Sequence, residues 1–474
     1  MNEKSYSLTH MIYEKDQYLE VKTSYDDHSV EISLNNSVYR LEYPRKVWAP
    51  LKDAIKRSIV DHIAFASTNY LTLIMGKKGV IYDTRLPLFD PSIFKNTICD
   101  LPSSAVLDKE HTADYIRDYF NMDFVFSREE TIVWSRPYKP TDTAIISFTS
   151  GKESLLTLAV CLELGLKPVL VNIIEPSNIY EHKHRLRLLE GLHEEFGVEY
   201  YTLPYEIGSL KDTKIDGVKG SSLGWGNQLF TYLFIFLPFI LQRRARYVFF
   251  GNEFSGDSET VNGEGFRTNF CYDQSSHWTL HLDNILRSLT GGAGRVGSLV
   301  GPLNEIAVAK CLHDGFPDLA KYQLSCFCDV PEAEEHRWCC SCSKCARNHA
   351  FLNALGKDPG DFGFWRDMFN EEYKPLFSVF GEGETFGYDR SGLGRVEQEL
   401  ALYMSAERFP ENEFLRSYMK ISRYNGGSDQ NKELFKRDYS YYFGLQDYPA
   451  VPRELRQRVY SIYERILYSD IRET

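Results

Sequence analysis

The feature that most constrains the fold is the abrupt change of pattern at residues 144–154. Residues 144–146 are apolar and read as a strand, residues 149–154 are small or polar, and helical apolar spacing begins immediately afterwards. A strand that leads through a tight turn into a helix directs several backbone N–H groups at one point, at the positive end of the helix dipole. The sequence therefore predicts a phosphate-binding turn at residues 149–154.

The side chains of this turn suit the same role. Thr149, Ser150 and Ser154 offer hydroxyls, Lys152 carries a fixed positive charge, and Glu153 can hold a magnesium ion. The turn also contains Gly151. Its spacing is that of neither a Walker loop nor a dinucleotide-binding loop. The alternative interpretation is an ordinary helix N-terminus, capped by one of the hydroxyls.

Residues 143–255 alternate strand and helix patterns. Strands are expected at 143–147, 169–173, 199–203 and 247–250, and helices at 153–164, 179–196 and 226–242. This alternation predicts an α/β fold with a doubly wound parallel sheet and helices on both faces. Ligands of such sheets bind beyond the carboxyl ends of the strands. Asn172, Glu175, Gly251, Asn252 and Glu253 are expected there, beside the turn.

The flanking regions have other patterns. Alternating runs at 19–22, 30–34 and 38–41, a helical stretch at 48–67 and an extended piece at 79–82 predict an α+β N-terminal domain over residues 1–140. A Pro-containing linker at 135–141 follows. Residues 141–325 form the expected α/β domain, and residues 326–474 a cysteine cluster and a mainly helical region with helices near 395–405, 412–421 and 452–468.

Composition excludes several functional classes. The net charge of −12 disfavours nucleic acid as a partner. The longest apolar run, residues 229–241, is too short to cross a bilayer, and the polar N-terminus has no signal-peptide pattern. We expect no membrane association and a cytoplasmic protein.

Six of the ten cysteines lie between residues 326 and 345. Cys339, Cys342 and Cys345 have the Cys-x-x-Cys-x-x-Cys spacing that can surround one tetrahedral Zn²⁺, with Cys326 or Cys328 as the fourth ligand. A shell of four sulfurs would make the zinc structural. A redox dithiol is the alternative, and Lys344 and Arg347 are expected to offset the thiolate charge.

The turn resembles the Ser-Gly-Gly-x-Asp-Ser loop of the PP-loop ATP pyrophosphatases, read here as Thr149-Ser150-Gly151-Lys152-Glu153-Ser154. Those enzymes cleave ATP between the α- and β-phosphates and transfer AMP to an oxygen of the substrate. The resemblance implies a PP-loop fold that binds ATP and Mg²⁺. Ser150 stands where the family usually has its first glycine.

Within this superfamily the chain is most similar to the ATP-dependent UDP-N-acetylmuramoyl-L-alanyl-L-glutamate epimerases of peptidoglycan synthesis. The similarity includes the long N-terminal domain, Gly251-Asn252-Glu253-Phe254-Ser255, the stretch from Tyr272 to Ser275, residues 301–306 and the cysteine segment. It implies adenylation of the terminal L-Glu carboxylate of a UDP-linked dipeptide, which acidifies the adjacent α-proton, followed by inversion to D-Glu. Lys152 would stabilise the departing pyrophosphate.

The residues that exchange the α-proton stay open among Glu175, Glu253, Asp273 and His277. Two alternative functions also stay open. One is an amidating enzyme similar to the 7-cyano-7-deazaguanine synthases, which share the pattern of Ser325, Cys326 and the later cysteines. The other is a non-catalytic nucleotide-binding protein.

Overall fold

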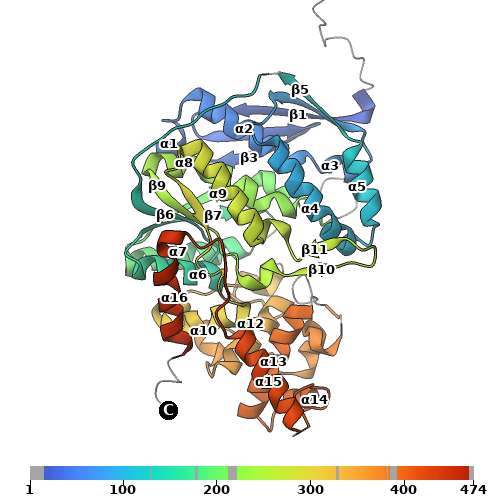
Figure 1. The fold of residues 1–474 in the computed structure, drawn as a ribbon, viewed down its shortest axis with the longest axis vertical. Helices are drawn as coiled ribbons and strands as arrows, with labels where there is room; N and C mark the ends of the chain where they lie inside the picture. Colours follow the sequence, from blue (N-terminus) through green and yellow to red (C-terminus); the bar gives the residue numbers. More distant parts are fainter. Residues whose placement is uncertain are drawn as a thin grey trace, which may run out of the picture.

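The computed structural model describes residues 15–468 except 129, 177–179, 212–220, 327–329, 382, 385–391 and 427. Two five-stranded sheets follow one another along the long axis of the molecule, and a group of helices lies at the far end (Figure 1). The N-terminal sheet is at the top of this view, the second sheet in the middle, and the orange and red C-terminal helices at the bottom.

The N-terminal sheet has the order β3-β2-β1-β4-β5. Its strands are β1 (Tyr18–Tyr25), β2 (Ser29–Leu34), β3 (Ser37–Glu42), β4 (Gly79–Arg85) and β5 (Asp123–Arg128). The first three form the expected antiparallel meander, and β4 and β5 continue it in parallel with β1. The helices of this part are α1 (Arg45–Trp48), α2 (Asp53–Thr68), α3 (Leu71–Met75), α4 (Asp90–Asp108) and α5 (Thr112–Phe120).

The second sheet has the order β12-β9-β6-β7-β8, and every neighbouring pair is parallel. Its strands are β6 (Thr141–Ser147), β7 (Lys167–Ile174), β8 (Glu199–Pro204), β9 (Ala245–Phe249) and β12 (Arg295–Gly297). The chain moves outward from β6 through β7 to β8, then returns to place β9 on the other side of β6. The expected α/β class with a parallel sheet is confirmed.

Helices cover both faces of this sheet. They are α6 (Lys152–Glu163), α7 (Glu181–Phe196), α8 (Gln228–Arg243), α9 (Ser276–Thr290) and α10 (Glu305–Gly315). Successive side chains of β6 point to opposite faces. Ile146 packs in the core that contains α6 and α10, whereas Ile145 packs in the core that contains α8 and the N-terminal sheet.

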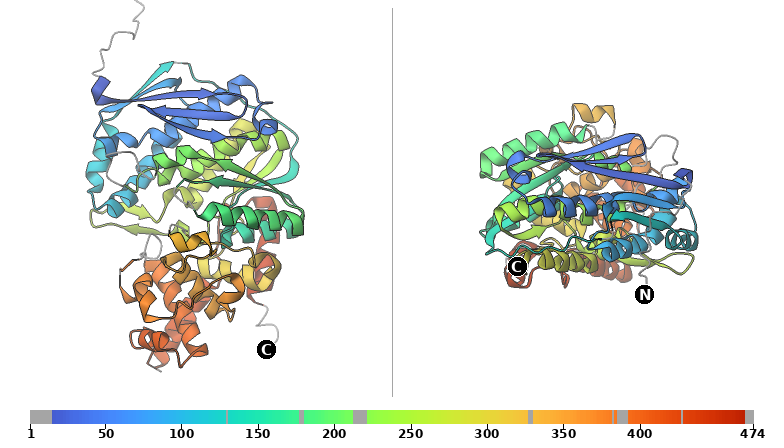
Figure 2. Two further views of the ribbon diagram at one scale, coloured as in Figure 1. Left: turned by 180° about the vertical axis from the view of Figure 1, so that it is seen from behind. Right: turned by 90° about the horizontal axis from the view of Figure 1, so that it is seen from above.

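The remaining helices are α11 (Pro317–Ala320), α12 (Ser343–Ala354), α13 (Gly392–Arg408), α14 (Glu413–Met419), α15 (Asp429–Tyr442) and α16 (Arg453–Leu467). Helices α12 to α15 share their own core, seen as the orange and red group at the bottom of the view from behind (Figure 2, left). The last helix, α16, leaves this group and packs on α10 in the core of the second sheet. The remaining strands, β10 (Glu259–Val261) and β11 (Arg267–Asn269), form a hairpin.

Candidate functional site

A cavity of about 610 Å³ opens at the carboxyl ends of β6, β7 and β9. This is where the strand order reverses about β6, the position at which open α/β sheets bind ligands. Its volume lies within the usual range of small-molecule sites. The polar and charged residues on its wall include Ser147, Thr149, Glu153, Ser154, Glu175, Arg185, Ser222, Gln228, Tyr232, Asn252, Glu253, Cys271, Gln274, Glu305, Lys344 and Arg347.

The turn between β6 and α6 lies at one end of this cavity. Ser150 adopts the left-handed conformation with φ of 57°, and Gly151 is the N-cap of α6. Side-chain hydroxyls already accept hydrogen bonds from three N–H groups of the turn. Ser154 Oγ accepts from Thr149 at 3.3 Å, Thr149 Oγ1 from Gly151 at 3.4 Å, and Ser325 Oγ from Lys152 at 3.3 Å.

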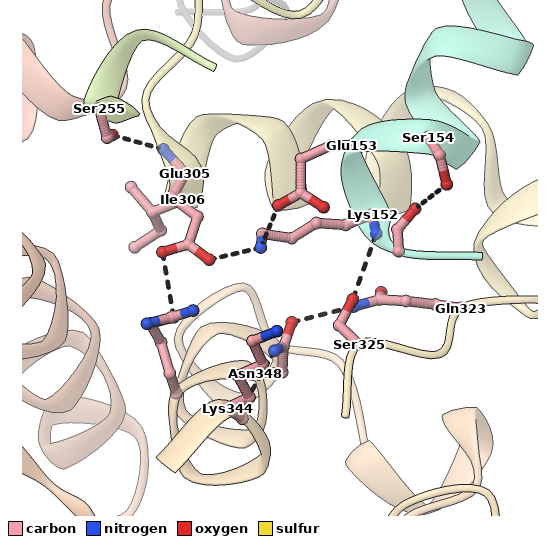
Figure 3. Close-up of polar contacts among 12 residues, drawn as sticks. Lys152, Glu153, Ser154, Ser255, Glu305, Ile306, Gln323, Ser325, Lys344 and Asn348 are labelled. Carbon is pink, nitrogen blue, oxygen red and sulfur yellow. Dashed lines mark hydrogen bonds and ion pairs between the residues drawn. The ribbon is translucent and has the colours of Figure 1, made fainter. Parts of the chain in front are cut away.

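Lys152 points away from open solvent, between two carboxylates (Figure 3). Its Nζ lies 2.5 Å from Glu153 Oε1 and 2.5 Å from Glu305 Oε1. Burial alone would lower the pKa of Lys152, but the two carboxylates outweigh it and raise the pKa above its usual value. The Lys152 side chain therefore stays protonated. Its charge is balanced by the Glu153 and Glu305 carboxylates, and the side chain does not project into the cavity.

Glu305 is the carboxylate that organises this charge cluster. Burial acts to raise its pKa, but Arg347 and Lys152 outweigh this effect and hold the pKa below its usual value. Arg347 Nε lies 3.0 Å from Glu305 Oε2. Glu305 begins α10, whose first N–H groups donate to Ser255 Oγ at 3.2 Å and to Glu397 Oε2 at 2.6 Å.

Residues 251–253, which follow β9, pack beside the turn at residues 149–154. A Cβ on Gly251 would lie 2.9 Å from Glu153 Cβ, so only glycine fits beside the first turn of α6. Asn252 donates its Nδ2–H to Thr279 Oγ1 at 3.0 Å. Burial, and then the Glu305 carboxylate, raise the pKa of Glu253 well above its usual value, so its surroundings favour the neutral carboxyl over the carboxylate.

The structure brings five of the predicted nucleotide-binding residues to the cavity wall, together with the proton-exchange candidate Glu253. The five are Thr149, Glu153, Ser154, Gly251 and Asn252. The other predicted nucleotide-binding residues are not among those that line the cavity. They are Ser150, Gly151, Lys152 and Asn172. Asn172 is buried and accepts from Arg185 Nη1 at 3.4 Å through its Oδ1. Asn172 therefore helps to position the Arg185 side chain, which lines the cavity.

The four candidates for proton exchange differ in position. Glu175 reaches the cavity but is held by Lys211 Nζ at 2.7 Å and by the Tyr232 hydroxyl. Asp273 is buried behind the wall. His277 bonds to the Tyr272 hydroxyl at 3.1 Å and lies outside the described wall. Glu253 lies on the wall, and its pKa is well above the usual value.

Four buried cysteines form the predicted sulfur cluster. The Sγ atoms of Cys326, Cys339, Cys342 and Cys345 lie within 4.8 Å of one another. Separations of 3.4 Å, 3.7 Å and 4.0 Å bracket the value of about 3.8 Å expected for a tetrahedron with Zn–S bonds of about 2.3 Å. The cluster could therefore hold a metal ion such as Zn²⁺. Cys328, the other candidate, lies outside the described residues.

The cysteine cluster fixes two segments that reach the cavity. Cys342 caps α12, which carries Lys344 and Arg347 to the cavity wall. Cys326 directly follows Ser325, the residue that accepts from the Lys152 N–H. The Arg347 guanidinium pairs with Glu305, and the expectation that Arg347 offsets the thiolate charge stays a prediction.

Sequence reasoning missed Arg185, Glu305 and Cys271 as residues of this site. Arg185 lies in a helix with ordinary charge patterning, so nothing in its neighbourhood marks it. Glu305 and Cys271 lie within or next to segments noted for resemblance, at residues 301–306 and 272–275. Their residue types in these positions do not by themselves indicate that their side chains line a cavity. The role of Glu305 depends on its tertiary contact with Lys152, whereas Cys271 contacts Asp273 two residues further along the chain.

A comparison with known protein families finds no match for this chain, and a search of curated proteins finds no relative either. Among the described residues, none of the helices combines the length and apolar character needed to cross a membrane.

Proposed function

We propose that this protein is an ATP-dependent epimerase of the PP-loop type, which adenylates the terminal L-Glu carboxylate of UDP-MurNAc-L-Ala-L-Glu and inverts it to D-Glu. The observation that carries the proposal is the cavity at the strand reversal, with the turn at residues 149–154 on one side and Glu253 on another. The particular substrate rests on the family resemblance of the sequence.

The residues on the cavity wall suit a nucleoside triphosphate with a bound Mg²⁺ ion. Glu153 is the carboxylate of the turn that reaches the cavity, and it would hold Mg²⁺ beside the phosphates. Lys344, Arg347 and Arg185 supply positive charge from the other walls. Phosphate oxygens that replaced the hydroxyls of Thr149, Ser154 and Ser325 would accept hydrogen bonds from the N–H groups at the start of α6.

The chemistry explains why ATP is needed. Removal of an α-proton beside a carboxylate creates a second negative charge next to the first. Conversion of the carboxylate to an acyl-adenylate removes the first charge and supplies a carbonyl that delocalises the carbanion. Proton return on the opposite face inverts the centre, and water then releases AMP.

The test is product analysis. Protein, Mg-ATP and UDP-MurNAc-L-Ala-L-Glu should yield AMP and pyrophosphate together with D-Glu, measured by chromatography and chiral analysis of the hydrolysed peptide. Gly251→Ala should abolish all three products, because its Cβ collides with the first turn of α6. Gly263→Ala, in the hairpin between β10 and β11, is a control for glycine replacement away from the cavity, since a Cβ there meets no atom within 4 Å. ADP as the product would reject the proposal, and AMP formation that requires ammonia would indicate an amidating enzyme.

One observation favours a second candidate, a nucleotide-binding protein without catalysis. The N–H groups of the turn are already bonded to hydroxyls, and Lys152 is committed to two carboxylates. Tight ATP binding without pyrophosphate release, in the presence of the UDP-linked dipeptide, would establish this alternative.

A further inference from the structure

Inversion at the α-carbon requires two groups, one that removes the proton and one that returns a proton from the other face. Glu253 provides one ionisable group at the end of β9, and its Oε2 is buried with no hydrogen-bond partner among the described residues. The second group has to come from another segment of the cavity wall. The wall formed after β11 contains one such group, the thiol of Cys271.

The Cys271 side chain is half-buried, and a hydrogen-bond acceptor lies next to its thiol. Its Sγ lies 3.0 Å from Asp273 Oδ1, so the S–H donates to this carboxylate. A thiol on a cavity wall with a carboxylate as its proton acceptor has the arrangement of a base assisted by a second residue.

Asp273 is held for this role by a helix. Its Oδ2 accepts from the Leu229 N–H at 2.9 Å, in the first turn of α8, where the helix dipole favours negative charge. Burial is the main cause that raises the pKa of Asp273 to about 7, with Asp100 also raising it and Lys211 lowering it. The carboxyl therefore accepts or releases a proton near neutral pH.

We infer that Cys271, assisted by Asp273, removes the α-proton of the acyl-adenylate, and that Glu253 returns a proton from the other side; the inference rests on the proposed function. The Cys271 sulfur binds the α-proton while its own S–H proton passes to the Asp273 carboxylate. The carbanion, delocalised into the acyl carbonyl, then takes the proton of the neutral Glu253 carboxyl. Asp273 finally loses its proton to water, and the Glu253 carboxylate gains one. The reverse reaction uses the same groups in exchanged roles.

The experiment separates adenylation from proton transfer in one variant. Cys271→Ala should form AMP and pyrophosphate from Mg-ATP and UDP-MurNAc-L-Ala-L-Glu within about threefold of the wild-type rate. Its formation of D-Glu, and its incorporation of α-deuterium in D₂O, should fall at least about 100-fold, as expected for loss of an acid–base residue. Cys99→Ala replaces a half-buried thiol outside the described cavity wall and should retain both reactions.

Asp273 acts through Cys271 and is tested as a positioning residue. The wild-type rate of inversion should rise with pH around 7 as Asp273 loses its proton. Asp273→Asn keeps an acceptor for the Leu229 N–H, and it should remove this rise while AMP formation persists.

Wild-type protein that forms neither AMP nor D-Glu would overturn the proposed function, and this inference with it. Wild-type activity together with normal inversion by Cys271→Ala would overturn the inference alone. Loss of both reactions in a Cys271→Ala protein with a normal thermal unfolding curve would also overturn it, because the residue would then serve binding or adenylation.

Discussion

Ser150 is the most strained residue of the turn. Its φ of 57° costs a non-glycine residue about 1–2 kcal/mol, and its hydroxyl is buried without a partner among the described residues. The strain persists because the Ser150 carbonyl is anchored by the Leu324 N–H at 2.8 Å and the turn is enclosed by neighbouring segments.

Ser150→Gly should therefore raise the free energy of unfolding by about 0.5–1 kcal/mol, measured by urea denaturation. The control is Ser288→Gly on the exposed face of α9, where glycine should lower stability by about 0.5 kcal/mol. A loss of stability in Ser150→Gly as large as in the control would show that the serine is not strained.

Asp61, in the middle of α2, provides a pH-dependent prediction. Burial is the main cause that raises its pKa from 3.8 to about 6. The folded state therefore holds this proton more tightly than the unfolded state, so the contribution of Asp61 to stability falls as the pH rises through about 6. Asp61→Asn should be more stable than wild type at pH 8 by up to about 2–3 kcal/mol, and the gain should vanish at pH 4.

Urea denaturation at the two pH values measures this difference. Asp27→Asn, an exposed carboxyl in the turn between β1 and β2, should change stability by the same small amount at both. An equal effect of Asp61→Asn at pH 4 and pH 8 would contradict the assignment of a buried, protonated carboxyl.

At the scale of elements, the cysteine cluster joins the start of α12 to the segment that contacts the turn. Metal binding at Cys326, Cys339, Cys342 and Cys345 would therefore hold two walls of the cavity in place. Four thiolates held together without a cation would repel one another.

We expect about one equivalent of zinc in protein purified without added metal. Its removal by a chelator should increase hydrogen exchange in α12 while the strands β6, β7 and β9 stay protected. Cys342→Ser should show the same exchange without a chelator. Cys340→Ser is the matched control, because this neighbouring buried cysteine is outside the cluster of four, and it should retain the metal. Metal-free wild type with unchanged exchange in α12 would contradict a structural role.

Most elements of the second sheet could be predicted from the sequence, because strand and helix patterns alternate there without interruption. Helix α4 was missed because Pro102 lies inside it, and β5, α9 and β12 because their apolar patterns are short or mixed with polar residues. The turn and the spacing of Cys339, Cys342 and Cys345 were found because each forms a local motif, whereas the fourth ligand stayed open between Cys326 and Cys328. The pairing of Lys152 with Glu305 joins residues that the sequence separates widely, so no local pattern indicates it.

At the scale of the whole molecule, the N-terminal sheet and one face of the second sheet share a single hydrophobic core. Helix α8 is buried between them, and its Phe234 stacks on His62 of α2 with ring centroids 4.1 Å apart. The boundary expected at residue 140 therefore separates two segments of the chain that share one hydrophobic core.

A fragment of residues 141–474 should accordingly be insoluble or lack a cooperative thermal transition, because it exposes the apolar face of α8. Co-expression with residues 1–140 should restore a soluble complex, measured by size-exclusion chromatography. An independently stable, monomeric 141–474 fragment would show that the shared core is dispensable.

The most direct test of the central claim is the transfer of oxygen from substrate to nucleotide. UDP-MurNAc-L-Ala-L-Glu with ¹⁸O in both oxygens of the adenylated carboxylate should give AMP that contains one ¹⁸O atom, measured by mass spectrometry. This result requires attack of the carboxylate on the α-phosphorus of ATP, which the cavity at the turn is proposed to direct. AMP without ¹⁸O, or ADP in its place, would contradict the account.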